Sequence, residues 1–426
     1  MSNQNHHHDH PQDPHHSPGP KKKKKVHHRI TKYLMERDTL LATVWVFIFI
    51  VVLGSIPLNL GIVNPIKLGL KDFDFNDLSY SKLGKAEHTN IDKRIVIVNI
   101  GYATREELAL MIDKVGSLKP KVMGLDALFY EARDPHQDSM LMACFAKNKN
   151  LIAARKLVLS GKDGGSVSEI SGDYINTASQ YAHVNFFQDS VSSIRTFEPF
   201  YQDHAHKLYP FFSTAIVKQY DVAAYEKLEK KGANKVIINY TRHTNQYLVV
   251  DYMDILGDNV DDSAFLNKIV LFGYVNFNPN DIEDKKFTPM NPRFAGKSVP
   301  DMNGIVIHAN IISMALDKDY VKKVPLWGNI LLAILVCWLH MSFFVHYYLE
   351  AHIWFHLAAK IAQVLSAIFF VWLGIYLYDK YRLKVDMKLS LVTIVLAVDV
   401  IYFYEAWAVW MHKKFNYKTV FKPHHH

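Results

Sequence analysis

RIVIVNIG, residues Arg94 to Gly101, is the stretch that decides the fold. Its apolar residues are continuous rather than alternating, which is typical of a strand that is buried on both faces. Thr104 and Glu107 then form a capping box that opens a helix with an apolar stripe. KVMGLDALF (Lys121–Phe129) is predicted as the next strand, so the two strands of this βαβ unit should be parallel. The sequence therefore predicts an α/β domain built on a largely parallel sheet.

The same alternation of helices and strands continues along the chain. A second helix is expected at about Asp138–Lys147, and a polar loop rich in glycine and serine at Gly161–Gly172. Further strands are predicted at Asn150–Val158, Ala182–Phe187, Lys235–Tyr240 and Lys268–Val275.

Four apolar stretches flank this domain, and each is long enough to cross a bilayer as a helix of about 20 residues. The first is too long for a signal peptide and lacks a small-residue cleavage site, so we expect an uncleaved anchor. The 426-residue chain is therefore predicted to be an α-helical multi-pass membrane protein with four spans and one extracytoplasmic α/β domain. The spans are Thr39–Leu58, Leu326–Tyr348, Ile353–Tyr378 and Leu389–Met411.

Basic residues near the spans predict the orientation of the chain. Lys21–Lys25 precedes the first span and a group of lysines from Lys413 to Lys422 follows the last, so both ends are predicted to be cytoplasmic. The connection from Lys380 to Lys388 is also basic and would lie outside, against this rule. The two aspartates of this connection offset its positive charge in part, and the two tails together contain more basic residues than the connection.

These patterns divide the chain into five parts. Residues 1–38 form a basic, His-rich cytoplasmic tail that is too polar to build a core, and we expect it to be disordered. The first membrane helix is placed at 39–63, the extracytoplasmic domain at 64–323, a three-helix membrane bundle at 324–411 and a short cytoplasmic tail at 412–426. The histidine clusters of both tails are interpreted as incidental, with weak metal binding as the alternative.

Charge and composition exclude several classes of function. The net charge of +8 comes largely from the tails, which favours contact with anionic membrane lipids over nucleic acid. Cys144 and Cys337 are the two cysteines, one in the domain and one in a span, and we do not expect them to meet. The sequence contains no G-x-S-x-G elbow, H-E-x-x-H pair or phosphate-binding glycine loop. It therefore predicts a binding module rather than an enzyme, without a cofactor, a metal site or a catalytic residue.

The strand ends nominate the candidate ligand-binding residues, because ligands of open α/β sheets bind beyond the carboxyl ends of the strands. This rule nominates five residues, Asn99, Asp126, Asn239, Asn276 and Asp281, and we select Asp126, Asn276 and Asp281 as the ligand-binding candidates. For Asp126 the alternatives are to cap the next turn or to pair with Arg133. The oxygen-rich loop of Asp281 lacks the regular spacing of a calcium loop, so a metal site is not favoured.

GIVIHANIISMAL (Gly304–Leu316) predicts a helix with an apolar stripe that packs the domain onto its exit into the membrane. His308 and Asn310 are expected to satisfy buried carbonyl groups rather than to serve a reaction. Gly304 is expected to permit close packing or the tight turn before the helix.

Lys360, Asp399 and Glu405 are ionisable residues inside predicted spans, where charges are costly and point to function. Lys360 and Glu405 are expected to pair across a helix interface, while His340 is the one candidate partner for Asp399. Two interpretations stay open for these buried charges: polar contacts between neighbouring helices, or an ion pathway or partner-binding site.

Seven blocks of the outer segment follow one another in a distinctive order. They are FDFNDLSY (Phe73–Tyr80), IVIVNIG (Ile95–Gly101), KPKVMGLDALFYE (Lys119–Glu131), AHVNFFQDSVSSIRTFEPF (Ala182–Phe200), VIINY (Val236–Tyr240), VLFGYVNFNPNDIEDKKFTPM (Val270–Met290) and MNGIVIHANIISMAL (Met302–Leu316). Together they resemble the CHASE sensor domain of the second type, the extracytoplasmic domain of many bacterial membrane receptors. The resemblance covers roughly Lys67 to Leu316. The chain departs from the family pattern at Asn99, where Asp is usual, and near Ser192 and Ser193, where Gly is usual.

This resemblance implies a sensor or signal-input subunit of a bacterial inner membrane that binds an envelope ligand or protein. Receptors of the family usually continue into a cytoplasmic output domain, whereas this chain ends shortly after its last span. We therefore expect it to act through an unidentified membrane or envelope protein, or as a homo-oligomer. The alternatives are a structural scaffold subunit of an envelope complex and, less favoured, an ion-conducting subunit.

Overall fold

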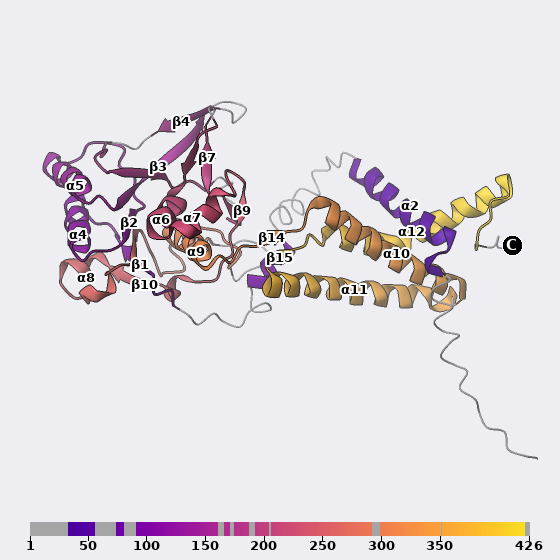
Figure 1. Ribbon diagram of the computed structural model, residues 1–426. Coiled ribbons are helices and arrows are strands. Elements are labelled where there is room, and N and C mark those ends of the chain that lie inside the picture. Colours follow the sequence, from indigo (N-terminus) through magenta and orange to yellow (C-terminus); the bar gives the residue numbers. More distant parts are fainter. Residues whose placement is uncertain are drawn as a thin grey trace, which may run out of the picture. The chain divides into compact units, whose positions relative to one another are not determined.

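The computed structural model describes residues 33–55, 74–80, 91–160, 166–170, 174–186, 192–203, 206–291, 299–350 and 352–421 (Figure 1). The chain divides into two compact units. The membrane unit comprises Met1–Pro57, Leu326–Phe369 and Lys388–His426, and the domain unit comprises Leu58–Pro325 and Phe370–Met387.

The domain unit is built on a seven-stranded sheet in the order β10-β1-β11-β2-β3-β4, with β5 also paired to β3. Only the β3–β4 pair is antiparallel among these described strands. The predicted largely parallel sheet is therefore confirmed. The strands are β1 (Ile95–Asn99), β2 (Val122–Leu125), β3 (Leu151–Ser160), β4 (Ser166–Ile170), β5 (Gln180–His183), β10 (Leu248–Asp251) and β11 (Ile269–Gly273).

Helices cover both faces of this sheet, as Figure 1 shows. Ile95 and Ile97 of β1 join one apolar core, whereas Val96 and Val98 join the core on the opposite face. This arrangement explains why the strand is apolar throughout rather than at every second residue. One face carries α4 (Arg105–Ser117), α5 (Pro135–Lys147) and α8 (Tyr252–Leu256), and the other α6 (Phe212–Tyr220), α7 (Val222–Glu229) and α9 (Gly304–Asp317).

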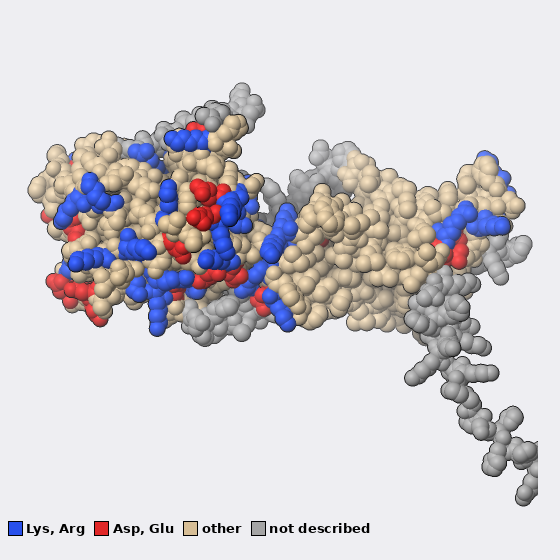
Figure 2. Space-filling view, in the orientation of Figure 1, with Lys and Arg blue, Asp and Glu red and all other residues tan. Residues whose placement is uncertain are grey.

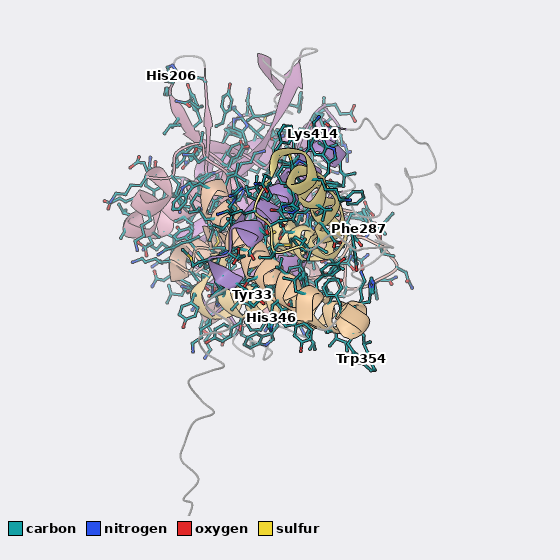
Figure 3. All side chains as sticks on the ribbon, turned by 90° about the vertical axis from the view of Figure 1, so that its right-hand side faces the viewer. Tyr33, His206, Phe287, His346, Trp354 and Lys414 are labelled. Carbon is teal, nitrogen blue, oxygen red and sulfur yellow. The ribbon has the colours of Figure 1, made fainter. Side chains whose placement is uncertain are left out.

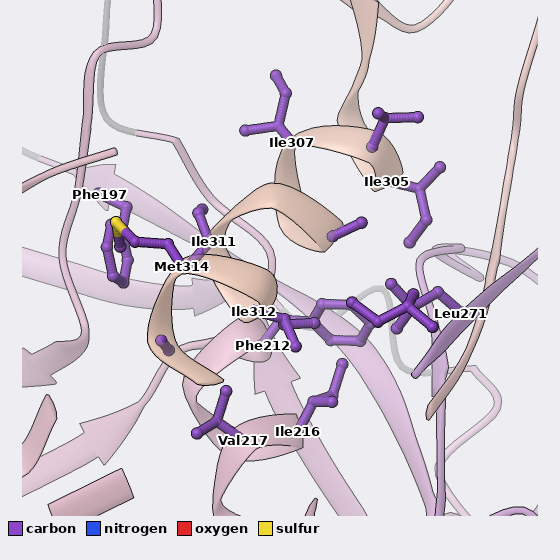
Figure 4. Close-up of a cluster of buried hydrophobic side chains, with 14 of the residues drawn as sticks. Phe197, Phe212, Ile216, Val217, Leu271, Ile305, Ile307, Ile311, Ile312 and Met314 are labelled. Carbon is purple, nitrogen blue, oxygen red and sulfur yellow. The ribbon is translucent and has the colours of Figure 1, made fainter. Parts of the chain in front are cut away.

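The core between α6 and α9 is shown in Figure 4, where Phe212 and Ile216 of α6 approach Ile312 of α9 and Leu271 of β11. All four side chains are fully buried. Burial of such side chains contributes about 1.5–3 kcal/mol each, so this layer holds α9 firmly on the sheet.

Local capping signals set where the helices of the domain unit begin. The main-chain N–H of Thr104 donates to Glu107 Oε2 (2.7 Å), and Glu107 N donates to Thr104 Oγ1 (3.2 Å), which confirms the predicted capping box. Asp134 caps α5 by accepting from Gln137 N (3.0 Å). As a result α5 begins at Pro135, earlier than the predicted start at Asp138.

Shorter elements complete the domain unit, and three of them differ from the sequence-based prediction. The predicted strand Lys235–Tyr240 is a strand only at β9 (Val236–Ile237), which pairs with β6 (Thr196–Phe197) outside the main sheet. Part of the predicted loop Gly161–Gly172 forms β4, while 161–165 and 171–172 lie outside the described residues. β10 was not predicted. The remaining elements are η2 (Phe75–Tyr80), β7 (Phe200–Gln202), β8 (Leu208–Pro210), η3 (Thr244–Gln246), η4 (Asp262–Ala264), β12 (Lys285–Lys286), β13 (Met302–Asn303), β14 (Lys322–Lys323) and β15 (Leu383–Lys384).

Four described helices are long and apolar enough to cross a membrane, as predicted: α2 (Arg37–Ser55), α10 (Leu326–Glu350), α11 (His352–Tyr381) and α12 (Lys388–Phe415). Most of the surface that their middle parts show in Figure 2 carries neither acidic nor basic side chains. α2, α10 and α12 share one core, to which Phe355 and Ala359 of α11 also contribute. The apolar window of α11 is 17% buried, against 44% for α10 and α12, so α11 exposes most of its apolar surface.

The segments next to the spans belong to the membrane unit rather than to loose tails. Asp38 is 1% exposed, and its carboxylate accepts hydrogen bonds from Tyr404 Oη (2.6 Å), Thr419 Oγ1 (2.9 Å) and Val420 N (2.6 Å). Tyr33 lies against His346, with ring centroids 4.7 Å apart (Figure 3). Residues 33–38 and 416–421, which the sequence assigns to tails, are thus packed on the helices. Residues 1–32 and 422–426 lie outside the described residues.

Cys144 and Cys337 are both buried free thiols, which confirms that they do not form a disulfide with each other.

Candidate functional site

The carboxyl ends of β1, β10 and β11 are tied together by Asn99. Its Nδ2 donates to Asp251 Oδ2 (3.1 Å), while its Oδ1 accepts from Gly101 N (3.2 Å) and Val275 N (2.9 Å). An amide donates and accepts at once, whereas an ionised carboxylate only accepts. Asn99 is therefore occupied in holding this edge of the sheet together.

Asp126 follows β2 at the same edge and lies beside the first residue of α9. A methyl group placed on Gly304 would be 3.7 Å from Asp126 Oδ2 and 3.4 Å from Asp284 Oδ2. The main-chain N–H of Gly304 also donates to Asp284 Oδ2 (3.3 Å). Two carboxylates thus flank the start of α9, where the helix dipole favours negative charge.

Burial and, to a smaller extent, the nearby charge of Asp284 together raise the pKa of Asp126 to about 7, although the charge of Lys286 opposes both effects. Burial also raises the pKa of Asp284 above its ordinary value, although Lys286 Nζ lies 3.8 Å from its Oδ1. Two carboxyl groups in one partly buried place cannot both ionise freely. Near neutral pH, Asp126 can therefore both donate and accept a hydrogen bond.

The pairing of Asp126 with Arg133 is not formed among the described residues. The main-chain N–H of Arg133 donates instead to Asp138 Oδ2 (2.9 Å), and the guanidinium of Arg105 binds the same carboxylate. Asp138 lies in the first turn of α5, so the main-chain N–H of Arg133 and the guanidinium of Arg105 are bound at that helix and not at the end of β2.

Asn276 and Asp281 lie in the loop after β11 and bond to each other. Asn276 Oδ1 also accepts from Asn278 N (2.8 Å), and Asp281 Oδ1 accepts from Glu283 N (2.9 Å). These atoms shape the loop, so of the three candidates Asp126 is the one whose carboxyl group is available to a ligand. No group of three or more His, Cys, Asp or Glu side chains in the described part of the chain could hold a metal ion.

Asn239, the remaining strand-end candidate, lies elsewhere. It is 1% exposed, and its Nδ2 donates to Asp319 Oδ2 (2.8 Å) just after α9. Asn239 is therefore a structural residue at the opposite end of α9 from Asp126.

His308 and Asn310 are buried on α9 and make specific contacts there. His308 Nδ1 lies 2.8 Å from Ser213 Oγ, and the ring stacks on Phe186 at 4.7 Å. Burial lowers the pKa of His308 to about 3, so the ring is neutral at physiological pH. Asn310 Oδ1 accepts from Arg242 N (3.1 Å), and its Nδ2 donates to Arg242 O (3.0 Å), which joins the helix to a neighbouring loop.

Close packing of α9 depends on Gly273 rather than on Gly304. A Cβ atom at Gly273 would lie 2.7 Å from Cβ of Ile305, a distance that real side chains do not adopt. At Gly304 the nearest atom would be at 3.4 Å, which is ordinary contact. The signal in the sequence was the glycine that closes the strand VLFG, which no helix-based prediction considered.

A second group of contacts, absent from the sequence-based prediction, connects the end of α9 with the segment between α11 and α12. We call it the junction and define it by Asp74, Tyr80, Asp319, β14, Tyr378, Arg382 and β15, all of which belong to the domain unit. β14 and β15 pair in parallel, and Lys322 N donates to Arg382 O (2.7 Å).

Side chains reinforce this strand pair. Arg382 Nε donates to Asp319 Oδ1 (2.8 Å), and Lys384 forms an ion pair with Asp74. The hydroxyl groups of Tyr80 and Tyr378 are hydrogen-bonded to each other. Two basic residues of the connection that departs from the positive-inside rule are thus paired with carboxylates of the domain.

The ionisable residues of the spans do not form the predicted pair. Glu405 accepts a hydrogen bond from the hydroxyl of Tyr348 on α10, whereas Lys360 is exposed on α11. Asp399 is also exposed, and His340 bonds to Ser366 Oγ (2.9 Å) rather than to Asp399. The Lys360–Glu405 prediction is wrong because Glu405 faces α10, a relation between helices that hydropathy does not reveal.

Comparison with known proteins agrees with the architecture. The family model of the CHASE2 domain matches residues 72–343, more than half of the chain. No curated protein and no solved structure matches the chain. The matched residues contain the whole seven-stranded sheet, α9 and most of α10. The resemblance seen in the sequence is confirmed, and the chain belongs to the CHASE2 family of sensor domains.

Proposed function

We propose that this chain is a membrane-embedded signal-input subunit whose domain binds an envelope ligand or protein and passes the event to the membrane helices. The observation that carries the proposal is the junction, which joins the end of α9 to the segment between two spans. A domain that only held its place beside the membrane would not need ion pairs and a strand pair at that segment.

α9 is the element that connects the two places. Its first residue lies between Asp126 and Asp284, and Asp319, two residues beyond its end, binds Arg382. The helix has 14 residues and is roughly 21 Å long. Because it is packed on β11 at Gly273, a shift of its first turn is transmitted along a rigid body to the junction.

The proposed ligand site lies at the carboxyl ends of the parallel strands. Asp126 is the residue that meets the ligand, and Asn276 and Asp281 shape the adjacent loop. A partly protonated carboxyl group suits a polar ligand that carries hydrogen-bond donors or a positive charge. The proposal includes binding without catalysis and without a cofactor.

The proposed location is a bacterial inner membrane with both ends in the cytoplasm and the domain outside. The basic residues near both ends support this orientation. The proposal includes action through a partner, either another membrane or envelope protein or a second copy of the chain.

The test is to isolate the full chain from its own membranes in lipid discs and to identify what accompanies it. Arg382→Gln with Lys384→Gln breaks the junction ion pairs, and Lys380→Gln, in the same connection, is the matched control. We expect the partner to stay bound in every variant, while the cellular phenotype is lost only in the double variant. A chain that supports the phenotype without any companion overturns the proposal.

The scaffold alternative gives a different result in the same experiment. A scaffold keeps its phenotype in the junction variants and in Asp126→Asn as long as the partner stays bound. For the ion-conducting alternative, Asp399→Asn removes a charge and nearly preserves volume, so conduction predicts a folded but inactive protein. A folded and fully active Asp399→Asn excludes that alternative.

A further inference from the structure

A pocket of 630 Å³ lies at the β10 edge of the sheet, apart from the Asp126 site. Its walls come from β1, β10, η3 and η4, with Ile91, Lys93, Lys268 and Phe277 around them. Small-molecule sites have volumes of about 300–1,000 Å³, so the pocket has the size of a ligand site.

Most of the lining is apolar, and the two charged residues in it are both basic. Ile91, Leu248 and Phe277 are 55%, 44% and 64% exposed, although each is a large apolar side chain. Lys93 and Lys268 are the charged lining residues among those described, and neither forms an ion pair within the described part of the chain. An apolar lining with unpaired lysines is complementary to an apolar molecule that carries one negative charge.

The strand register places the two pocket lysines at the starts of adjacent strands. Ile95 of β1 pairs with Ile269 of β11, Lys93 comes two residues before Ile95, and Lys268 comes one residue before Ile269. Both basic residues therefore stand at the amino ends of adjacent parallel strands, while the apolar side chain of Leu248 comes from the neighbouring edge strand β10.

The pocket is at the end of the domain unit where α9 leads into β14. Tyr247, a lining residue, has its hydroxyl 3.2 Å from Ser313 Oγ of α9. Arg94, next to Lys93, binds Asp317 at the last turn of α9 (2.7 Å). A molecule with a single apolar chain and one negative charge is therefore a suitable occupant in chemistry.

We propose that this pocket binds a single-chain fatty acid, with its carboxylate near Lys93 and Lys268 and its alkyl chain against Leu248, Val249 and Phe277. The proposal concerns binding alone and does not depend on the function proposed above. Its failure leaves the junction experiment unaffected.

The test uses the full chain in phosphatidylcholine discs and a dodecanoic acid that carries a photoreactive diazirine on its chain. Peptides are then mapped by mass spectrometry. We expect labelling of the peptides that contain Leu248 or Phe277, and at least tenfold better competition by dodecanoate than by dodecanol. Dodecyltrimethylammonium, which has the same chain and the opposite charge, should not compete.

Lys93→Gln with Lys268→Gln should weaken competition by dodecanoate about tenfold and leave dodecanol unchanged. Lys149→Gln with Lys227→Gln, two exposed lysines outside the pocket, is the matched control. Equal competition by the acid and the alcohol, or labelling confined to the membrane helices, overturns the proposal. Two results with the Leu248→Asp variant also overturn the proposal. One is that the variant is still fully labelled, and the other is that the substitution converts a dimer of the chain into monomers.

Discussion

His308 makes the stability of the domain depend on pH. Its pKa is about 3 in the folded protein against an ordinary 6.5, because the ring is buried. Below pH 6.5 the unfolded chain binds a proton that the folded chain does not. Stability is therefore lost as pH falls from 6.5 towards 3, by at most about 1.4 kcal/mol per pH unit. Denaturant unfolding of the purified chain at pH 6.5 and pH 5 measures this loss.

His308→Gln is the control for that measurement, because an amide keeps a polar partner for Ser213 and does not titrate in this range. Asp126 acts in the opposite sense. Its raised pKa means that stability is lost as pH rises from 3.8 through 7, so the experiment is repeated in Asp126→Asn. An unchanged slope in His308→Gln would show that another group causes the acid sensitivity.

Gly273 and Gly304 give a matched pair of substitutions. Gly273→Ala forces a methyl group to within 2.7 Å of Ile305 and should destabilise the domain by about 1–3 kcal/mol. Gly304→Ala meets its neighbours at ordinary contact distances and should change stability by less than about 1 kcal/mol. Chemical denaturation of both variants in parallel decides the matter, and equal losses would contradict this account of how α9 is packed.

Single residues could be predicted from the sequence where the signal is local. The capping box of Thr104 and Glu107 depends on residues three apart, so the sequence was sufficient. The hydrogen bonds of Asn310 to Arg242 join residues 68 positions apart, and only the general expectation of a buried polar contact was available. Asp126 could be nominated from its strand end, but its neighbour Asp284 could not, because a loop brings it back to α9.

At the scale of elements, the contact between α10 and α12 through Tyr348 and Glu405 leads to another prediction. Tyr348→Phe removes the hydroxyl that Glu405 accepts from and should cost about 0.6–2 kcal/mol, the range of polar contacts between membrane helices. Lys360→Met should leave the stability effect of Glu405→Gln unchanged, because the two side chains are not paired. Thermal unfolding of the single and double variants in lipid discs measures both couplings, and a coupling of Lys360 with Glu405 above about 0.5 kcal/mol would refute this assignment.

Helices and central strands were more predictable than edge strands. β1 and β11 are buried on both faces and therefore carry continuous apolar runs. β10 is a four-residue edge strand with an exposed Leu248, and its pairing with β1 is decided by the sheet rather than by its own sequence. β9 shows the opposite error, since an apolar run of strand-like residues packs beside α9 and pairs with β6 instead of joining the sheet.

For the whole molecule, the predicted topology has both termini on one side of the membrane and the domain on the other. Reporter fusions at Ser166, at the start of β4, and after the C-terminus should give opposite compartments. The two fusions should differ because an even number of spans, here four, returns the C-terminus to the side of the N-terminus, while Ser166 follows only the first span. A cytoplasmic signal from the Ser166 fusion would reverse the orientation.

Under the predicted orientation, the junction offsets part of the positive charge that the connection between α11 and α12 would carry to the outer side. Arg382 and Lys384 are paired with Asp319 and Asp74, so less uncompensated positive charge remains in that segment. Counting lysines and arginines along the sequence cannot include this effect, because the compensating carboxylates lie up to 310 residues away.

The buried carboxylate of Asp38 also sets an order of events during synthesis. Its partners Thr419 and Val420 are made about 380 residues later, which takes roughly 20–75 s at ordinary rates of translation. Until then the carboxyl group of Asp38, at the start of α2, has neither of these two donors. The contacts of Asp38 are therefore completed only after Thr419 and Val420 have been made, and a chain that stops before Thr419 leaves the carboxyl group of Asp38 without these two hydrogen-bond donors.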